Sequence, residues 1–154
     1  MMKKTKQSKV YHNTVLLLRS YKNLKEHIDG SESLIKIENQ ALEDWTSFNN
    51  TAVTFEDYLK STKKTKTVTI AMIRLVERYL KLYKADAKKR NDANKLIRYQ
   101  VIDLKYISKN YSIEEIANSM GKDISTIQRY HRKAIEELGV YFFGIEGLKL
   151  EKID

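Results

Sequence analysis

The sequence predicts an all-α protein, and three observations lead to that prediction. The 154 residues include no proline and only five glycines, whereas proline makes up about 5% of average sequences and is the strongest helix breaker. Lys, Glu, Leu and Ile, which are compatible with helices, are abundant. Apolar residues also recur in steps of three and four along most of the chain, which is the spacing of one helix face.

The first part of the chain is predicted to form an N-terminal helical region, residues 1–60. Its expected elements are helices at about residues 9–28 and 32–48 and a short amphipathic piece at residues 55–59. Residues 61–67 contain only Lys, Ser and Thr, which is typical of a linker. We therefore expect residues 68–154 to form the second domain.

Within this second domain, apolar spacing predicts helices at about residues 68–83 and 93–109. The polar segment from Lys84 to Lys95 is compatible with either helix or loop. A further helix is expected to end at Gly139, since glycine favours helix C-termini. The apolar tail from Val140 to Leu148 should fold back on the core, with an oligomer contact as its alternative role.

The net charge of +9 is concentrated in one part of the sequence. Fifteen basic and four acidic residues lie between Lys60 and Lys109. A strongly basic chain favours an anionic partner, with nucleic acid ahead of a membrane surface. Lys88, Lys89 and Arg90 form the densest cluster and are predicted to contact phosphates.

A helix-turn-helix pattern occupies residues 113–132. This motif needs buried apolar residues at set offsets, a small residue where its two helices touch, and a glycine in the turn. Ala117 and Gly121 supply the small residue and the turn. Ser112 and Glu115 have the spacing of a capping box, and Asp123 is expected to cap the second helix. The predicted buried set is Ile116, Met120, Ile127 and Tyr130.

In such a motif the second helix enters the DNA major groove with its N-terminal residues facing the bases. The predicted base contacts are Ile124, Ser125, Gln128, Arg129 and Arg132. The predicted phosphate contacts beside the motif are Lys122, Thr126 and Lys133. Lys122 departs from the pattern, because an apolar residue usually follows the turn glycine. We expect His131 to be a surface residue.

Other functional classes find little support in the sequence. Without Cys there are no disulfides and no thiolate chemistry, and three scattered His do not predict a metal site. There is no glycine-rich phosphate loop and no recognisable nucleophile constellation, so we expect no enzymatic activity, catalytic residue or cofactor. The apolar run Val15–Leu18 is too short for a signal peptide or a membrane span, so we expect no membrane partner.

The span from residues 111–117 through residues 134–138 resembles the sigma-type helix-turn-helix, the last DNA-binding region (region four) of bacterial sigma factors. Residues 16–25, 97–103 and 138–144 are similar to the ArpU family, which with the related RinA-type activators comprises phage late-gene transcriptional regulators. The resemblance implies a sigma-region-four-like domain and a location in the bacterial cytoplasm, at the nucleoid.

What the resemblance implies is a sequence-specific activator of phage or phage-satellite late genes that binds double-stranded promoter DNA. We expect the N-terminal helices to form a homodimer or to contact RNA polymerase, because their apolar stripe exceeds the need of one small domain. The alternative is a phage small terminase subunit, which is also small, basic and helical but recognises DNA for packaging. A ring-sized oligomer favours the terminase.

Overall fold

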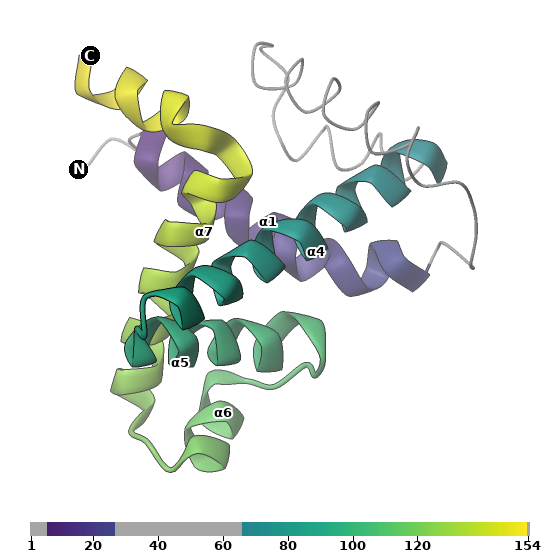
Figure 1. Cartoon of the computed structure of the whole chain (residues 1–154). Helices are drawn as coiled ribbons and strands as arrows, with labels where there is room; N and C mark the ends of the chain where they lie inside the picture. Colours follow the sequence, from purple (N-terminus) through teal and green to yellow (C-terminus); the bar gives the residue numbers. More distant parts are fainter. Residues whose placement is uncertain (1–5, 27–65, 154) are drawn as a thin grey trace, which may run out of the picture.

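Helices are the regular structure in residues 6–26 and 66–153, which are the residues that the structure describes, and no strand occurs among them. The predicted all-α class is confirmed. In this computed structural model the elements are α1 (Lys6–Glu26), α4 (Lys66–Lys89), α5 (Ala93–Ile102), the π-helical turn η1 (Asp103–Ile107), α6 (Ile113–Met120) and α7 (Ile124–Ile153). Figure 1 shows α6 and the start of α7 at the end of the molecule remote from the N-terminus of α1.

The first expected helix corresponds to α1. The expected helix at 32–48, the amphipathic piece at 55–59 and the start of the linker lie outside the described residues. Because α4 begins at Lys66, the last two linker residues, Lys66 and Thr67, are helical.

The polar segment after Tyr83 is mostly helical, since α4 continues to Lys89. The chain then turns through Asn91, whose φ is +52°. Asp92 begins α5 by accepting a hydrogen bond from the Lys95 N–H at 3.0 Å. The expected helix at 93–109 is α-helical only to Ile102 and continues as η1 to Ile107. Ser108 follows η1, and its N–H bonds to the Asp103 carbonyl at 2.9 Å.

The main core is built jointly by α1, α4 and α7, with contributions from α5 and η1. Its most deeply buried members include Leu17 and Leu18 of α1, Met72 of α4, and Ile135 and Leu138 of α7, each at most 1% exposed. Leu17, Leu18, Tyr21 and Leu24, in the apolar stripe of α1, are therefore covered within the chain. The expected boundary between residues 1–60 and 68–154 does not separate two cores among these helices.

Gly139 does not end a helix, contrary to our expectation. It is buried inside α7, and a Cβ atom there would lie 2.9 Å from Val10 Cγ1 and 3.1 Å from Thr14 Oγ1 of α1. Gly139 is thus the place where α1 and α7 approach each other closely. The helical conformation breaks at Gly144, where φ is +77° and ψ is 165°.

In the part whose side chains are described, the tail beyond Gly139 packs into the core, as predicted, but it does so as a continuation of α7 and does not turn back at Gly139. Phe142 is 1% exposed and Phe143 8%. Tyr79 of α4 packs edge-on against Phe142, with ring centroids 5.8 Å apart. Burial of these rings holds this part of α7 against α4.

Candidate nucleic-acid interface

The two expected helices of the motif and the turn between them are present as α6 and α7. The Ser112 hydroxyl accepts from the Glu115 N–H at 3.1 Å, and the Glu115 carboxylate accepts from the Ser112 N–H at 3.0 Å, which completes the predicted capping box. Gly121 ends α6 with φ +65°, in the left-handed region that glycine favours. The Lys122 N–H then bonds to the Ala117 carbonyl at 3.0 Å and closes the turn.

A small second core supports this unit. Ile116, Ala117 and Ile127 are at most 3% exposed and pack with Val101 at the end of α5. Met120 and Tyr130, also predicted to be buried, are partly buried against the same cluster. This core holds the first turns of α7 against α5 and α6, so that the opposite face of α7 stays in solvent.

All five predicted base-contact residues lie on that solvent face. Ile124 is 46% exposed, a large fraction for an isoleucine. The other exposed members are Ser125, Gln128, Arg129 and Arg132. We call these five residues the outward row.

The three phosphate-contact residues predicted beside the motif differ in their surroundings. Lys122 and Lys133 are exposed, which resolves the departure at Lys122: its side chain stands in solvent instead of entering the core. Thr126 is half-buried, and its hydroxyl accepts from Arg129 Nη2 at 3.3 Å. Asp123 begins α7 through its carbonyl, which accepts from the Ile127 N–H at 3.1 Å.

The predicted cluster at the end of α4 is exposed but partly neutralised. Lys88, Lys89 and Arg90 all reach solvent. Arg90 Nε lies 3.0 Å from Asp86 Oδ1, and Asp86 also binds Lys95 Nζ at 2.6 Å. Lys95 lowers the pKa of the Asp86 carboxyl by its hydrogen bond and charge, and Arg90 adds to this. Lys88 and Lys89 therefore remain as the uncompensated charges of the cluster.

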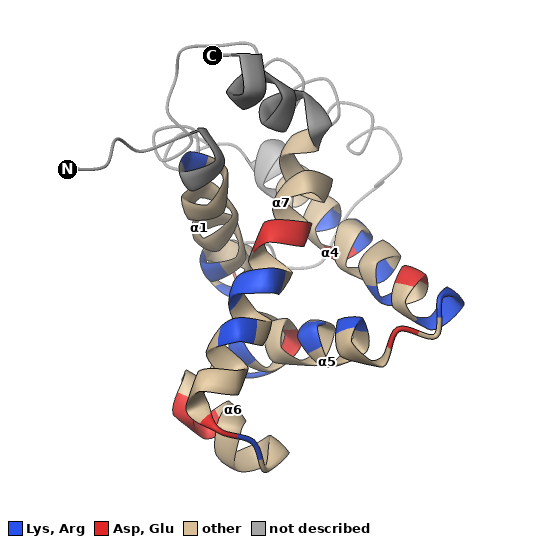
Figure 2. Cartoon of the chain, turned by 90° about the vertical axis from the view of Figure 1, so that its left-hand side faces the viewer, with Lys and Arg blue, Asp and Glu red and all other residues tan. Residues whose placement is uncertain are grey.

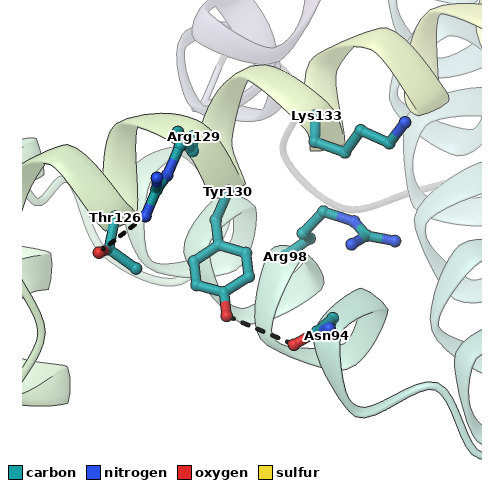
Figure 3. Close-up of a pocket in the computed structure, with 6 residues that line it drawn as sticks. All are labelled: Asn94, Arg98, Thr126, Arg129, Tyr130 and Lys133. Carbon is teal, nitrogen blue, oxygen red and sulfur yellow. Dashed lines mark hydrogen bonds between the residues drawn. The ribbon is translucent and has the colours of Figure 1, made fainter.

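An open hollow of about 230 Å³ lies between α5 and α7. Figure 3 shows its lining side chains, which come from both helices: Asn94, Arg98, Thr126, Arg129, Tyr130 and Lys133. The Tyr130 hydroxyl donates to Asn94 Oδ1 at 3.4 Å and so links the two walls. The hollow adjoins the outward row, with which it shares Arg129.

Arg98 is held in place by a network that joins three helices. Its Nε lies 2.8 Å from Glu137 Oε1 of α7, and the same carboxylate oxygen accepts from the Tyr83 hydroxyl of α4 at 2.7 Å. Burial and the bond to Glu137 raise the pKa of Tyr83 well above its usual value. The network fixes the relative positions of α4, α5 and α7 beneath the hollow.

The hollow is not predicted by the sequence pattern. Asn94 belongs to no recognisable motif, and Arg98 is one of many cations in the basic block. The local pattern predicts an apolar face for Tyr130 but not its hydroxyl partner, which is 36 residues away in the chain. A hollow between two helices depends on how they pack, and sequence spacing within one helix does not report this.

His131 is not a simple surface residue, which corrects our expectation. Its Nε2 is joined to the Tyr106 hydroxyl by a hydrogen bond of 2.8 Å. Burial, with Lys105 and Arg19 nearby, lowers the pKa of His131 to about 4. The imidazole is therefore neutral at physiological pH and belongs to the packing between α7 and η1.

Charges are distributed unevenly around the unit. Figure 2 shows Lys and Arg positions along α5 and the first half of α7, while α6 carries acidic positions. The acids Glu114 and Glu115 lie in the first turn of α6, where the helix dipole favours negative charge. The exposed basic residues of the unit therefore lie on α7 and just before it, because Lys95 and Arg98 of α5 are largely buried and paired with Asp86 and Glu137.

No protein-family model, no curated protein and no solved structure matches this chain. Among the residues that the structure describes, no helix combines the length and apolar character needed to cross a bilayer.

Proposed function

We propose that this chain is a sequence-specific double-stranded DNA-binding protein that regulates transcription. The observation that supports this best is the outward row. Five side chains, among them Gln128, Arg129 and Arg132, stand exposed on the first turns of α7 while α5 and α6 hold its other side. This is the arrangement in which a helix presents its N-terminal residues to the major groove.

The chemistry of the row suits reading of bases. Arginine pairs with guanine through two hydrogen bonds, and glutamine does the same with adenine. Ile124 offers an apolar surface for a thymine methyl group.

The basic excess supports the same proposal. Binding that neutralises phosphates releases counterions, so affinity falls as salt rises. Lys88 and Lys89 at the end of α4, and Lys133 beside the row, are exposed cations suited to this role.

The promoter class rests on resemblance alone. The segments similar to the ArpU family favour activation of phage or phage-satellite late genes. We also propose that the N-terminal helices contact RNA polymerase. Homodimer formation must use side chains other than Leu17, Leu18 and Leu24 of α1, because these three are buried in the chain's own core.

The proposal is tested by selecting binding sites from random DNA duplexes and then mapping bound DNA in the host. We expect one enriched sequence, salt-dependent affinity, and bound sites upstream of late genes. Absence of any enriched sequence contradicts the proposal. Sites confined to a packaging start, with a ring-sized oligomer in solution, favour the terminase.

Arg129→Ala gives the residue-level test. Loss of a bidentate base contact is expected to weaken binding by about 1–3 kcal/mol and to relax preference at one base pair. Arg78→Ala is the matched control, because it removes the same charge from the exposed face of α4. Selection with both variants measures the preference, and an Arg129→Ala profile identical to the parent's contradicts this docking.

A further inference from the structure

The hollow between α5 and α7 collects positive charge that the protein itself does not neutralise. Arg129 and Lys133 are one helix turn apart, and like charges at that spacing destabilise a helix. Neither forms an ion pair within the part of the chain that the structure describes. Such an arrangement is favourable when an anion from outside completes it.

The other wall of the hollow is rigid and offers a hydrogen-bond donor. Arg98 is anchored by Glu137 at 2.8 Å, with Asp92 at 4.0 Å, and its side chain is 13% exposed. Asn94 uses its Oδ1 to accept from Tyr130, which leaves its Nδ2 to donate. Figure 3 shows the Arg98 and Lys133 head groups extending toward the same side of the hollow.

The shape of the hollow indicates what kind of anion it takes. Pockets for small molecules enclose most of their ligand in about 300–1,000 Å³. This hollow is smaller, about 230 Å³, and open to solvent. It therefore suits an anion that stays attached to a larger surface.

We propose that the hollow binds one backbone phosphate of double-stranded DNA, beside the base pairs read by the outward row. This inference rests on the proposed DNA-binding function and adds Asn94 and Arg98 of α5 to its contacts. Arg129 lies at the rim shared by the hollow and the row. The bound phosphate thus sets the register of α7 in the groove, because phosphate contacts position a protein and base contacts specify the sequence.

Asn94→Asp separates binding from folding. The carboxylate still accepts from Tyr130, and an acid in the first turn of α5 is favoured by the helix dipole. We therefore expect the midpoint of urea unfolding to stay the same or rise. Repulsion of the phosphate should weaken binding to the selected duplex about tenfold. Unchanged affinity in this variant overturns the proposal.

Neutral phosphates locate the contact. Each phosphate of the selected duplex is replaced in turn by an uncharged methylphosphonate, and affinity is measured for the parent, Asn94→Asp, Lys133→Ala and Lys9→Ala. We expect the parent to lose about tenfold in affinity at the phosphate that the hollow binds, besides the losses at phosphates contacted by Lys88 or Lys89. At that position the affinity of Lys133→Ala should fall by less than about twofold. On the same modified duplex, Asn94→Asp should bind as well as the parent. Lys9→Ala, an exposed α1 control, should behave as the parent.

Two other results are informative. If Lys133→Ala loses as much as the parent at every methylphosphonate, the phosphate lies elsewhere and the proposal is overturned. If inorganic phosphate shifts the Asn94 amide resonance at millimolar concentration while no methylphosphonate position couples to the hollow, the site takes free phosphate and the DNA assignment is overturned. A parent chain that selects no DNA sequence at all contradicts the proposed function, which separates the two failures.

Discussion

At the scale of single residues, His131 shows how packing sets chemistry on α7. The imidazole is one position away from Arg132 of the outward row, yet it packs against Tyr106. Burial raises the pKa of the Tyr106 hydroxyl to about 12 and lowers that of His131 to about 4. Both groups are neutral at physiological pH. The hydrogen bond between them therefore leaves the positive charges of the nearby Lys105 and Arg19 unchanged.

This predicts a pH dependence of stability. Because the pKa of His131 is lowered in the folded state from 6.5 to about 4, the unfolded chain binds more protons within this window. The stability that the neutral His131 contributes should therefore be fully present above pH 6.5. The free energy of unfolding should decrease as the pH falls from 6.5 toward 4. Urea unfolding at pH 7 and pH 5 measures the loss. His131→Gln, which keeps a hydrogen-bonding group but does not titrate, should lose less; an equal loss in both proteins contradicts the assignment.

Lys88 is predicted to act on DNA without regard to sequence. Lys88→Ala should weaken binding to all duplexes about equally and lower the slope of log affinity against log salt by about one unit. The reason is that one phosphate charge is no longer neutralised and one fewer counterion is released. Titrations at several salt concentrations test this, with Lys9→Ala as the control. A change confined to one DNA sequence indicates a base contact instead.

At the scale of elements, the crossing of α1 and α7 depends on Gly139. The missing side chain lets the two helices approach, since a Cβ atom would lie 2.9 Å from Val10 Cγ1. A glycine inside a helix is intrinsically unfavourable by about 1 kcal/mol relative to alanine. Close packing between helices accounts for its presence here.

Gly139→Leu is expected to destabilise the protein by about 1–3 kcal/mol through overpacking. Val10→Ala in the same chain should recover part of the loss, because it removes the nearest atom. Gly121→Ala provides the contrast: its Cβ meets nothing within 4 Å, but its φ is +65°, so it is strained by backbone conformation alone. Urea unfolding of the single and double variants measures this. If Val10→Ala also restored the stability of Gly121→Ala, its effect would not be specific to the contact between α1 and α7.

At the scale of the whole molecule, the described helices depend on one another across long stretches of sequence. Leu17, Leu18 and Leu24 of α1 are buried against α4 and α7. Tyr21 adds a hydrogen bond of 2.6 Å from its hydroxyl to Glu77 Oε2 of α4. The DNA-binding unit proposed for α6 and α7 is thus built on a core that includes the N-terminal helix.

A chain beginning at residue 66 is therefore expected not to fold. Each fully buried leucine contributes about 1.5–3 kcal/mol, and whole domains are stable by only about 5–15 kcal/mol. Loss of three such residues removes a large part of that margin. Thermal melting followed by near-ultraviolet circular dichroism compares residues 66–154 with the full chain. A cooperative transition in the shorter chain would show that α1 is dispensable for the core.

The agreement between prediction and structure is greatest where the physics is local. The capping box of Ser112 and Glu115, the turn at Gly121 and the exposure of the outward row follow from spacing within about one helical turn. The errors have the opposite character. Gly139 looks like a helix end to local rules, and His131 looks like a surface residue, because the partners that decide their roles are far away in the chain.

The amino-acid sequence by itself determined the all-α class, the positions of most described helices and the row of side chains on α7. Helix periodicity and capping depend on residues that are close in the sequence, so they can be predicted without knowledge of the tertiary structure. Only the tertiary structure decided that α1 shares the core, that Arg98 is anchored by Glu137 across 39 residues, and that the hollow forms beside the row. Helix packing brings these groups together, and no pattern within one helix encodes the distance between two of them.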